Sequence, residues 1–202
     1  MLLEELNKIL ELSWCKDTCT PNMKDSWNEN NKALGQCAVT ALIVNDFLGG
    51  KIMRCTSESG SHYYNIIDSH IVDLTSSQFN IKPNYSVFEK RTRDYLLSND
   101  DTKNRYLLLL KRVKDNFIKY GANEYKLLGI NGNYLSKIPG TCAGHSDLRV
   151  YGKVDCPSTL IYLGDDCGVY FENEEVANTL GYRPCSVCMK KEFKKWEQSK
   201  QK

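Results

Sequence analysis

The chain has 202 residues, of which 41% are hydrophobic and 26% charged, and its formal net charge is +2 at pH 7, an ordinary composition for a globular protein. No apolar stretch approaches the roughly 20 residues that a membrane helix needs, and "MLLEELNKILELSW" carries acidic residues where a secretory signal would be basic and then apolar. These features argue against a membrane or secreted protein, so we expect a cytoplasmic protein without a membrane partner.

The nine cysteines are many for a cytosolic chain, in which thiols more often bind metal or do chemistry than form disulfides. They form two groups separated by a long gap: Cys15, Cys19, Cys37 and Cys55, then Cys142, Cys156, Cys167, Cys185 and Cys188. Within the gap, a helix is predicted from about residue 101, followed by the Gly- and Asn-rich "GANEYKLLGINGNYLSKIPG". The sequence therefore predicts two units, residues 1–133 and 134–202.

The segment "GQCAVTALIVNDFLGG", residues 35–50, places one cysteine before an almost wholly apolar run. From Ala38 to Leu48 this run predicts a buried helix, and Gly49 is well placed to end it. Cys37 then lies at the helix N-terminus, where unpaired amides and the positive end of the dipole favour the nucleophilic thiolate. The same amides can hold an oxyanion, with the Gln36 side chain as a further candidate donor.

A base for this thiol is predicted in "SHYYNIIDSHIVDLT", which we interpret as two short strands around a turn at Asp68 and Ser69. A two-residue loop places Asp73 opposite Tyr64, so His62 and Asp73 become diagonal neighbours on one sheet face. His70 points to the other face. Cys37, His62 and Asp73 thus supply a nucleophile, a base and an orienting carboxylate. The alternative is that Cys37 is an inert packing residue, the commoner role of a buried cysteine.

The motifs "SW", "GQCAVTALIVNDFLGG", "SHYYN", "VDLTSSQF", "RDYLLS" and "TKNRY" resemble the uncharacterised YunG-like family of bacteria, over roughly residues 10–115. The Cys, His, Asp order is similar to the papain-like and transglutaminase-like fold, in which the cysteine opens a helix packed on an antiparallel sheet. This resemblance implies an α+β domain and peptidase, amidase, deamidase or acyl-transfer chemistry. Gln36, directly before the cysteine, departs from many papain-like enzymes.

The remaining N-terminal residues favour structural roles. Cys15 and Cys19 form one Cys-x-x-x-Cys pair without a second pair nearby, and Cys55 is predicted to be a core residue. The aromatic side chains could line a substrate cleft, although core packing is their commoner role: Trp14, Trp27, Tyr63 and Tyr64.

The second unit contains "CGVYFENEEVANTLGYRPCSVC", residues 167–188. It predicts a strand, then a helix with Asn173 as its N-cap and Gly181 at its C-terminal end. Cys185 and Cys188 have the Cys-x-x-Cys spacing of two ligands in a tetrahedral zinc site. Two further ligands must come from upstream, and the candidates are Cys142, His145, Cys156 and Cys167.

This unit resembles the small metal-binding domain of the Ada DNA-repair protein over about residues 137–198, through "DCPS", "VYF", "NEEVANTLGYRPCSVC" and "FKKW". The resemblance implies that Cys156 is a zinc ligand and that Gly152 stands where the first ligand cysteine of Ada would be. Suicidal methyl transfer by that cysteine is therefore not expected. His145 is the predicted substitute, because neutral imidazole binds zinc well; Cys142 is its rival, followed by Cys167.

Charge argues against non-specific nucleic-acid binding. Residues 134–202 hold ten Lys and Arg and nine Asp and Glu, and the rest of the chain holds 17 and 16, so each part has a formal net charge of +1. The lysine-rich end carries Phe193 and Trp196 at helical spacing, which favours an amphipathic helix packed on the zinc core with solvated lysines over phosphate binding.

The expected protein is an intracellular thiol enzyme, a peptidase, amidase or acyl transferase acting on a protein, peptide or small amide. It would use Cys37, His62, Asp73 and Gln36, and carry a structural zinc ion on His145, Cys156, Cys185 and Cys188. The alternative is a non-catalytic zinc-containing protein that recognises nucleic acid or a protein partner.

Overall fold

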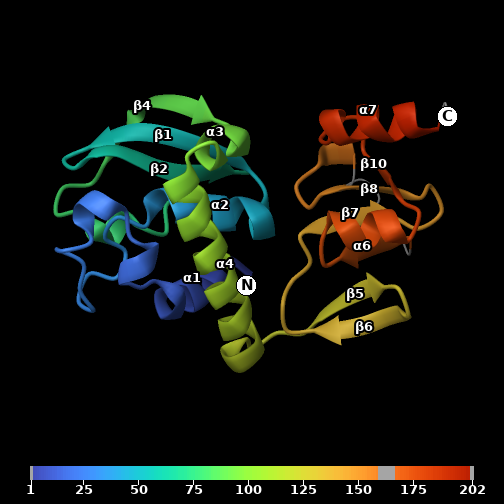
Figure 1. Ribbon diagram of the computed structural model, residues 1–202, viewed down its shortest axis with the longest axis horizontal. Coiled ribbons are helices and arrows are strands. Elements are labelled where there is room, and N and C mark those ends of the chain that lie inside the picture. Colours follow the sequence, from blue (N-terminus) through green and yellow to red (C-terminus); the bar gives the residue numbers. More distant parts are fainter. Residues whose placement is uncertain (1, 159–166, 201–202) are drawn as a thin grey trace. The chain divides into compact units, whose positions relative to one another are not determined.

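The computed structural model describes residues 2–158 and 167–200, and the chain divides into two compact units, Met1–Gly121 and Ala122–Lys202. Both combine helices with mainly antiparallel sheets, so the fold is α+β (Figure 1). No helix among the described residues is long and apolar enough to cross a membrane.

The helices of the first unit surround its core. They are α1 (Leu2–Ser13), α2 (Cys37–Leu48), α3 (Arg93–Leu97) and α4 (Asp100–Tyr120), with short 3-10 turns at Lys16–Thr18, Pro21–Met23 and Ser76–Gln78. Contacts join α1, α2 and α4 to one another, and α2 also packs on the sheet. Figure 1 shows α2 between the sheet and α1, with α4 running across it. Nearly all of α2 is therefore enclosed, which explains its apolar sequence.

The sheet of the first unit has four antiparallel strands in the order β3-β2-β1-β4: β1 (Lys51–Ser57), β2 (Gly60–Ile67), β3 (His70–Val72) and β4 (Asn84–Arg91). The predicted hairpin is confirmed, because Asn65 pairs with Val72 and Ile67 with His70. Asp68 and Ser69 have positive φ angles of 48° and 66°, as expected for a two-residue turn of type I′.

The predicted helix at Cys37 is also confirmed. It begins at Cys37 and ends at Leu48, and Gly49 follows with φ 73°, a conformation that favours glycine. The Asn45 side chain donates to the carbonyl oxygens of Gly49 and Gly50, which fixes the turn into β1.

The second unit is built on a sheet of order β10-β8-β7-β9: β7 (Cys142–His145), β8 (Val150–Lys153), β9 (Gly168–Phe171) and β10 (Arg183–Pro184), of which only β10 and β8 are parallel among the described strands. It also contains the hairpin β5 (Tyr125–Gly129) and β6 (Gly132–Ser136), and the helices α6 (Glu174–Thr179) and α7 (Lys190–Ser199). The expected N-cap is present, since the Asn173 side chain accepts from the Val176 amide. Gly181 has the positive φ of a helix end, 79°.

The division between the units differs from the predicted position. The sequence placed it near residue 133, whereas the compact units meet at Gly121 and Ala122. The reason is that β5 contacts β9, so the Gly- and Asn-rich segment forms a hairpin of the second unit instead of a linker.

The core of the first unit predicts a large stability cost for truncating one helix residue. Phe117 on α4 is fully buried and its ring lies 5.6 Å from that of Phe47, measured between centroids. Phe117→Ala should lower the free energy of unfolding by about 3–5 kcal/mol, because it leaves a cavity. Its neighbour Ile118 is 63% exposed, so Ile118→Ala should change the same quantity by no more than about 0.5 kcal/mol. Urea unfolding followed by tryptophan fluorescence measures both, and equal effects would contradict the packing described.

Candidate thiol and metal sites

Cys37 is held at the start of α2 by a tightly packed preceding turn. Gly35 has φ 67°, and a Cβ atom there would lie 2.6 Å from the Cys19 sulfur, so glycine is required. The Gly35 carbonyl accepts from the Thr20 amide, and its own amide donates to the Gln78 side chain. The first turn of α2 therefore has a fixed position, with its unpaired amides beside the Cys37 thiol.

Cys37 is partly exposed and faces a pocket of about 260 Å³. The pocket is lined mainly by uncharged polar and aromatic side chains, including Asn22, Ser59, Tyr63 and Phe79, together with Arg105. The guanidinium of Arg105 already has protein partners, since its Nε donates to Asp101 and another of its nitrogens donates to the Thr18 carbonyl oxygen. A small polar molecule can thus reach the thiol.

His62 lies on β2 with its side chain fully buried. Its Nε2 is 2.5 Å from Asp73 Oδ2, and the edge of its ring contacts Phe79, with 4.8 Å between centroids. The other ring nitrogen, Nδ1, is buried and has no hydrogen bond of standard geometry within the described part of the chain. The Cys37 side chain is nevertheless close enough to act on the imidazole. The structure therefore brings the three predicted residues together.

Asp73 follows β3 and is held by several donors. Its Oδ2 accepts from Tyr85 Oη at 2.7 Å as well as contacting His62, and its Oδ1 accepts from the Thr75 amide and hydroxyl at 3.0 and 3.1 Å. Only 4% of the side chain is exposed. A buried carboxylate with this many donors stays ionised and has a fixed orientation.

The electrostatics of the site favour a charged imidazole. Burial by itself would lower the pKa of His62, but the hydrogen bond to Asp73 and the adjacent Cys37 side chain raise that pKa to about 9. Burial would raise the pKa of Asp73, whereas its contacts with His62, Tyr85 and Thr75 hold that pKa below its usual value. At neutral pH the site therefore holds an imidazolium next to the Asp73 carboxylate and the Cys37 side chain.

The Gln36 side chain does not reach the pocket. It is fully buried, its Nε2 donates to the Cys15 carbonyl oxygen at 3.0 Å, and it is not a lining residue. Its amide therefore braces the segment before α2, in place of the oxyanion contact expected from the sequence. The first-turn amides are the remaining donors beside Cys37.

The other N-terminal candidates separate into core and pocket residues. Trp14, Tyr64 and Cys55 are buried core residues, whereas Tyr63 lines the pocket. Burial raises the pKa of Cys19 to about 11, so this thiol is unreactive at neutral pH.

Tyr85 and Thr75 were missed by sequence reasoning. Thr75 had a local signal, because an Asp followed two residues later by a polar residue commonly closes an Asx turn. Tyr85 had none, since its contact with Asp73 depends on the pairing of a distant strand.

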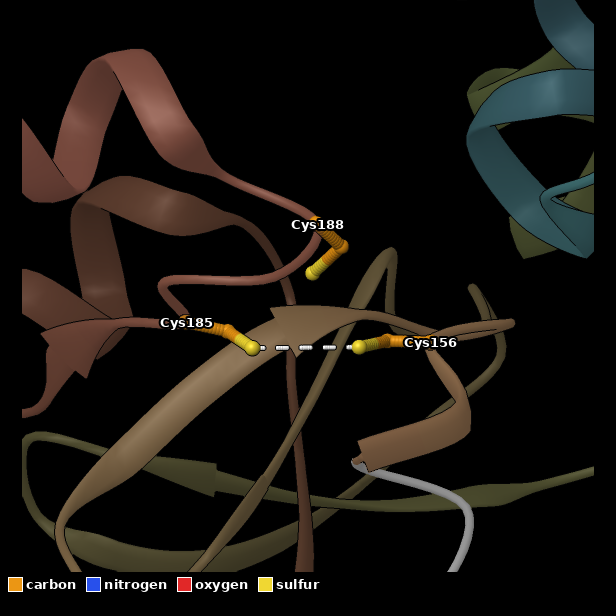
Figure 2. Close-up of side chains that lie close together, drawn as sticks. All are labelled: Cys156, Cys185 and Cys188. Atoms are coloured by element: carbon orange, nitrogen blue, oxygen red, sulfur yellow. Dashed lines mark hydrogen bonds between the residues drawn. The ribbon is translucent and has the colours of Figure 1, made fainter.

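The second unit holds a cluster of three thiols (Figure 2). The sulfur atoms of Cys156, Cys185 and Cys188 all lie within 4.8 Å of one another, and those of Cys156 and Cys185 are 3.8 Å apart. The backbone amides of Val187 and Lys153 donate to the sulfurs of Cys185 and Cys188, both at 3.4 Å. Two sulfurs bound tetrahedrally to one zinc ion at about 2.3 Å are about 3.8 Å apart, so the cluster can hold a metal ion.

The predicted fourth ligand lies outside this three-residue cluster. His145 ends β7, lines a pocket of about 180 Å³ together with Cys185, and its Nδ1 accepts from the Asp147 and Leu148 amides. Its rival Cys142 packs in the apolar core. Cys167 donates to the Asp147 carboxylate at 3.3 Å.

The raised pKa of His62 predicts how stability changes with pH. The value is 6.5 in a model peptide and about 9 in the folded protein, so the stabilising contribution of the imidazolium is complete below pH 6.5 and is lost as the pH rises through 9. Between pH 6.5 and 9.5 the wild type should lose up to about 3 kcal/mol of unfolding free energy relative to His62→Ala. Urea titrations at both pH values measure this. His70→Ala, at an exposed histidine, should keep the wild-type dependence; equal pH dependence in all three proteins would contradict the charged pair.

Comparisons with known proteins place the first unit. A family model described as "YunG protein" matches residues 2–118, which lie within that unit. "Uncharacterized protein YunG" of Bacillus subtilis (strain 168) is 29% identical over 105 residues, which are 52% of this chain and 87% of that protein. No solved structure matches. Because the family model covers more than half of the sequence, this chain belongs to the YunG family.

Proposed function

We propose that the first unit is a thiol-dependent hydrolase or acyl transferase with Cys37 as nucleophile, His62 as acid and base, and Asp73 as the orienting carboxylate. The observation that carries this proposal is the fully buried imidazole of His62, which contacts Asp73 through Nε2 and whose pKa the neighbouring Cys37 side chain helps to raise. A purely structural histidine has no need of a partly exposed thiol at a helix N-terminus beside a pocket.

In the proposed reaction the Cys37 thiolate attacks the carbonyl carbon of an amide or ester, and the carbonyl electron pair moves to the oxygen. The first-turn amides of α2 stabilise that oxyanion. Collapse expels the amine or alcohol, which takes a proton from His62 and leaves a thioester on Cys37. Water or an amine then attacks the thioester while His62 accepts its proton, and the thiolate departs. Asp73 fixes the imidazole throughout.

The arrangement supports a papain-like or transglutaminase-like assignment. The cysteine opens a helix that packs on an antiparallel sheet, and that sheet supplies histidine and then aspartate in chain order. The substrate class that follows is a protein, a peptide or a small amide, delivered through the pocket at Cys37. Triads of this kind are recognised by their geometry and by the roles of their residues, so this similarity supports a reaction type and not a particular substrate.

A binding protein with an inactive first unit is the competing proposal. The second unit would then recognise nucleic acid or a protein partner through surfaces such as the exposed lysines of α7. Arg183 lies over the Phe193 and Trp196 rings, so the aromatic face of α7 is used in packing against β10. That packing favours a structural helix over a nucleic-acid surface.

Thiol labelling tests the enzyme proposal. At pH 6.5 iodoacetamide should label Cys37 at least about tenfold faster than Cys15, because only Cys37 combines a helix N-terminus with a neighbouring buried histidine. Cys15 is the matched comparison, since both thiols are partly exposed. Peptide mass spectrometry of timed samples measures each rate.

His62→Ala should reduce the labelling rate of Cys37 to that of Cys15, whereas His70→Ala should leave it unchanged. If Cys37 reacts like an ordinary thiol in the wild type, or if its rate is independent of His62, the enzyme proposal fails and the binding alternative gains support.

For the second unit we propose a structural zinc ion on Cys156, Cys185 and Cys188, as in the Ada-like domain. The 3.8 Å sulfur separation and the two amide donors to sulfur support a site for thiolates and a tetrahedral ion. Gly152 on β8 offers no side chain at the position where Ada has its first ligand cysteine. Three thiolates leave one coordination position to another group.

His145 remains the predicted fourth ligand. It lines the same pocket as Cys185, whereas Cys142 packs in the apolar core. Zinc binding through either imidazole nitrogen would break the two hydrogen bonds that the backbone amides donate to Nδ1. Binding through Nδ1 uses the lone pair that accepts them, and binding through Nε2 places the proton on Nδ1. Zinc binding by His145 would thus rearrange the loop at Asp147 and Leu148.

Metal analysis tests this second proposal. The purified protein should contain about one zinc ion per chain, and a strong chelator should unfold the second unit while the folded first unit keeps its labelling pattern. Elemental analysis and the amide NMR spectrum measure the two effects. His145→Ala should weaken zinc retention far more than Cys142→Ser or Cys167→Ser. A second unit that is folded without metal would refute the structural role, and loss of zinc only in Cys142→Ser would move the fourth ligand to that residue.

A further inference from the structure

One oxygen of Asp73 is shared by two donors from different strands. Oδ2 lies 2.5 Å from His62 Nε2 on β2 and 2.7 Å from Tyr85 Oη on β4. The Asp73 side chain is only 4% exposed, so water screens these contacts little. The atom that orients the imidazole is thus itself held by a hydroxyl from the opposite edge strand of the sheet.

A bulge in β4 delivers this hydroxyl. Cys55 pairs with Phe88 and the next residue, Thr56, pairs with Asn84, so residues 85–87 lie between two consecutive pairs. The Asn84 side chain accepts from the Ser86 amide and stabilises the irregular segment. Bulges re-aim side chains and recur beside functional sites.

The two ends of the bulge point in different directions. Val87 is 71% exposed, whereas the edge of the Tyr85 ring packs on Tyr64, with 4.9 Å between centroids, and the Tyr85 hydroxyl reaches Asp73. A regular strand would keep strict alternation of side chains, so the bulge determines which residue meets the carboxylate.

We infer that Tyr85 is a positioning residue of the proposed Cys37 site, which orients Asp73 and limits how strongly this carboxylate holds the His62 proton. The inference rests on the proposed function only for its catalytic meaning. Tyr85 is not a lining residue of the pocket at Cys37, and its hydroxyl contacts Asp73, so it acts through that carboxylate.

The physical reason is competition for one negative charge. A hydroxyl that donates to Oδ2 withdraws electron density from the hydrogen bond with His62. Without that hydroxyl, the carboxylate would stabilise the imidazolium more strongly, and the pKa of His62 would rise above about 9. A stronger pair would make the imidazolium a poorer proton donor to the leaving group.

The other groups around the imidazole do not replace this effect. The titratable groups next to the imidazole or to its partner Asp73 come from each neighbouring element: Cys37 of α2, Cys55 of β1, Tyr64 of β2, Asp73 after β3 and, on Asp73, Tyr85 of β4. Burial raises the pKa of Cys55 and of Tyr64, so both are neutral at neutral pH. The Tyr85 hydroxyl donates to Asp73 Oδ2, the same oxygen that His62 contacts.

The test is a histidine titration in full-length variants. The chain has only three histidines, His62, His70 and His145, so the imidazole NMR signal of His62 can be assigned by its loss in His62→Ala. Tyr85→Phe keeps the ring and removes the hydroxyl; it should raise the pKa of His62 by about half a unit or more, the equivalent of one neutral hydrogen bond. The matched control is Tyr64→Phe, which removes a hydroxyl from the adjacent ring and should leave the His62 pKa unchanged.

The outcomes separate this inference from the proposed function. A His62 pKa that is the same in Tyr85→Phe as in the wild type overturns the positioning role, whatever the reactivity of Cys37. A raised pKa together with an unreactive Cys37 in the wild type supports the role of Tyr85 and overturns the enzyme. If Tyr85→Phe is too unstable to titrate, Tyr85→Leu must give the same rise, and its absence counts against the inference.

Discussion

The contact between His62 and Asp73 is the constraint on which the first unit depends. Both side chains are almost completely removed from water, and an unpaired charge at that depth would be strongly destabilising. Each group is tolerable only because the other is within hydrogen-bond distance and because further donors reach Asp73. The two-residue turn between β2 and β3, the Asx turn at Thr75 and the bulge in β4 all serve to keep this pair satisfied.

The local parts of that arrangement could be predicted from the sequence because each depends on short-range rules. An Asp-Ser pair between two apolar strands fixed the turn, and the strand period of two then placed His62 and Asp73 on one face. The apolar run after Cys37 and the glycine at its end were enough for α2. The Cys-x-x-Cys spacing likewise placed Cys185 beside Cys188, because a short turn cannot separate them far.

The features that were predicted wrongly or missed depend mostly on contacts between distant segments. Gln36 directly precedes the thiol, yet its amide reaches the Cys15 carbonyl, a contact that only the packing of the N-terminal segment decides. Tyr85 enters the site through a bulge, which no local motif announces. The boundary near residue 133 was misplaced because Gly and Asn serve equally in linkers and in hairpin turns.

The two units also differ in what stabilises them. In the first, α2 is buried among the sheet, α1 and α4, so a central helix supplies much of the apolar burial. In the second, a described core cluster of six buried residues, among them Tyr151, Phe171 and Tyr182, supports short strands and short helices. A unit with so small a core commonly needs an additional cross-link, and three converging thiols are suited to provide one through a metal ion. The roles proposed for these cysteines follow from that difference: chemistry for the partly exposed thiol at the N-terminus of α2, and stability through a metal ion for the three clustered thiols of the small unit.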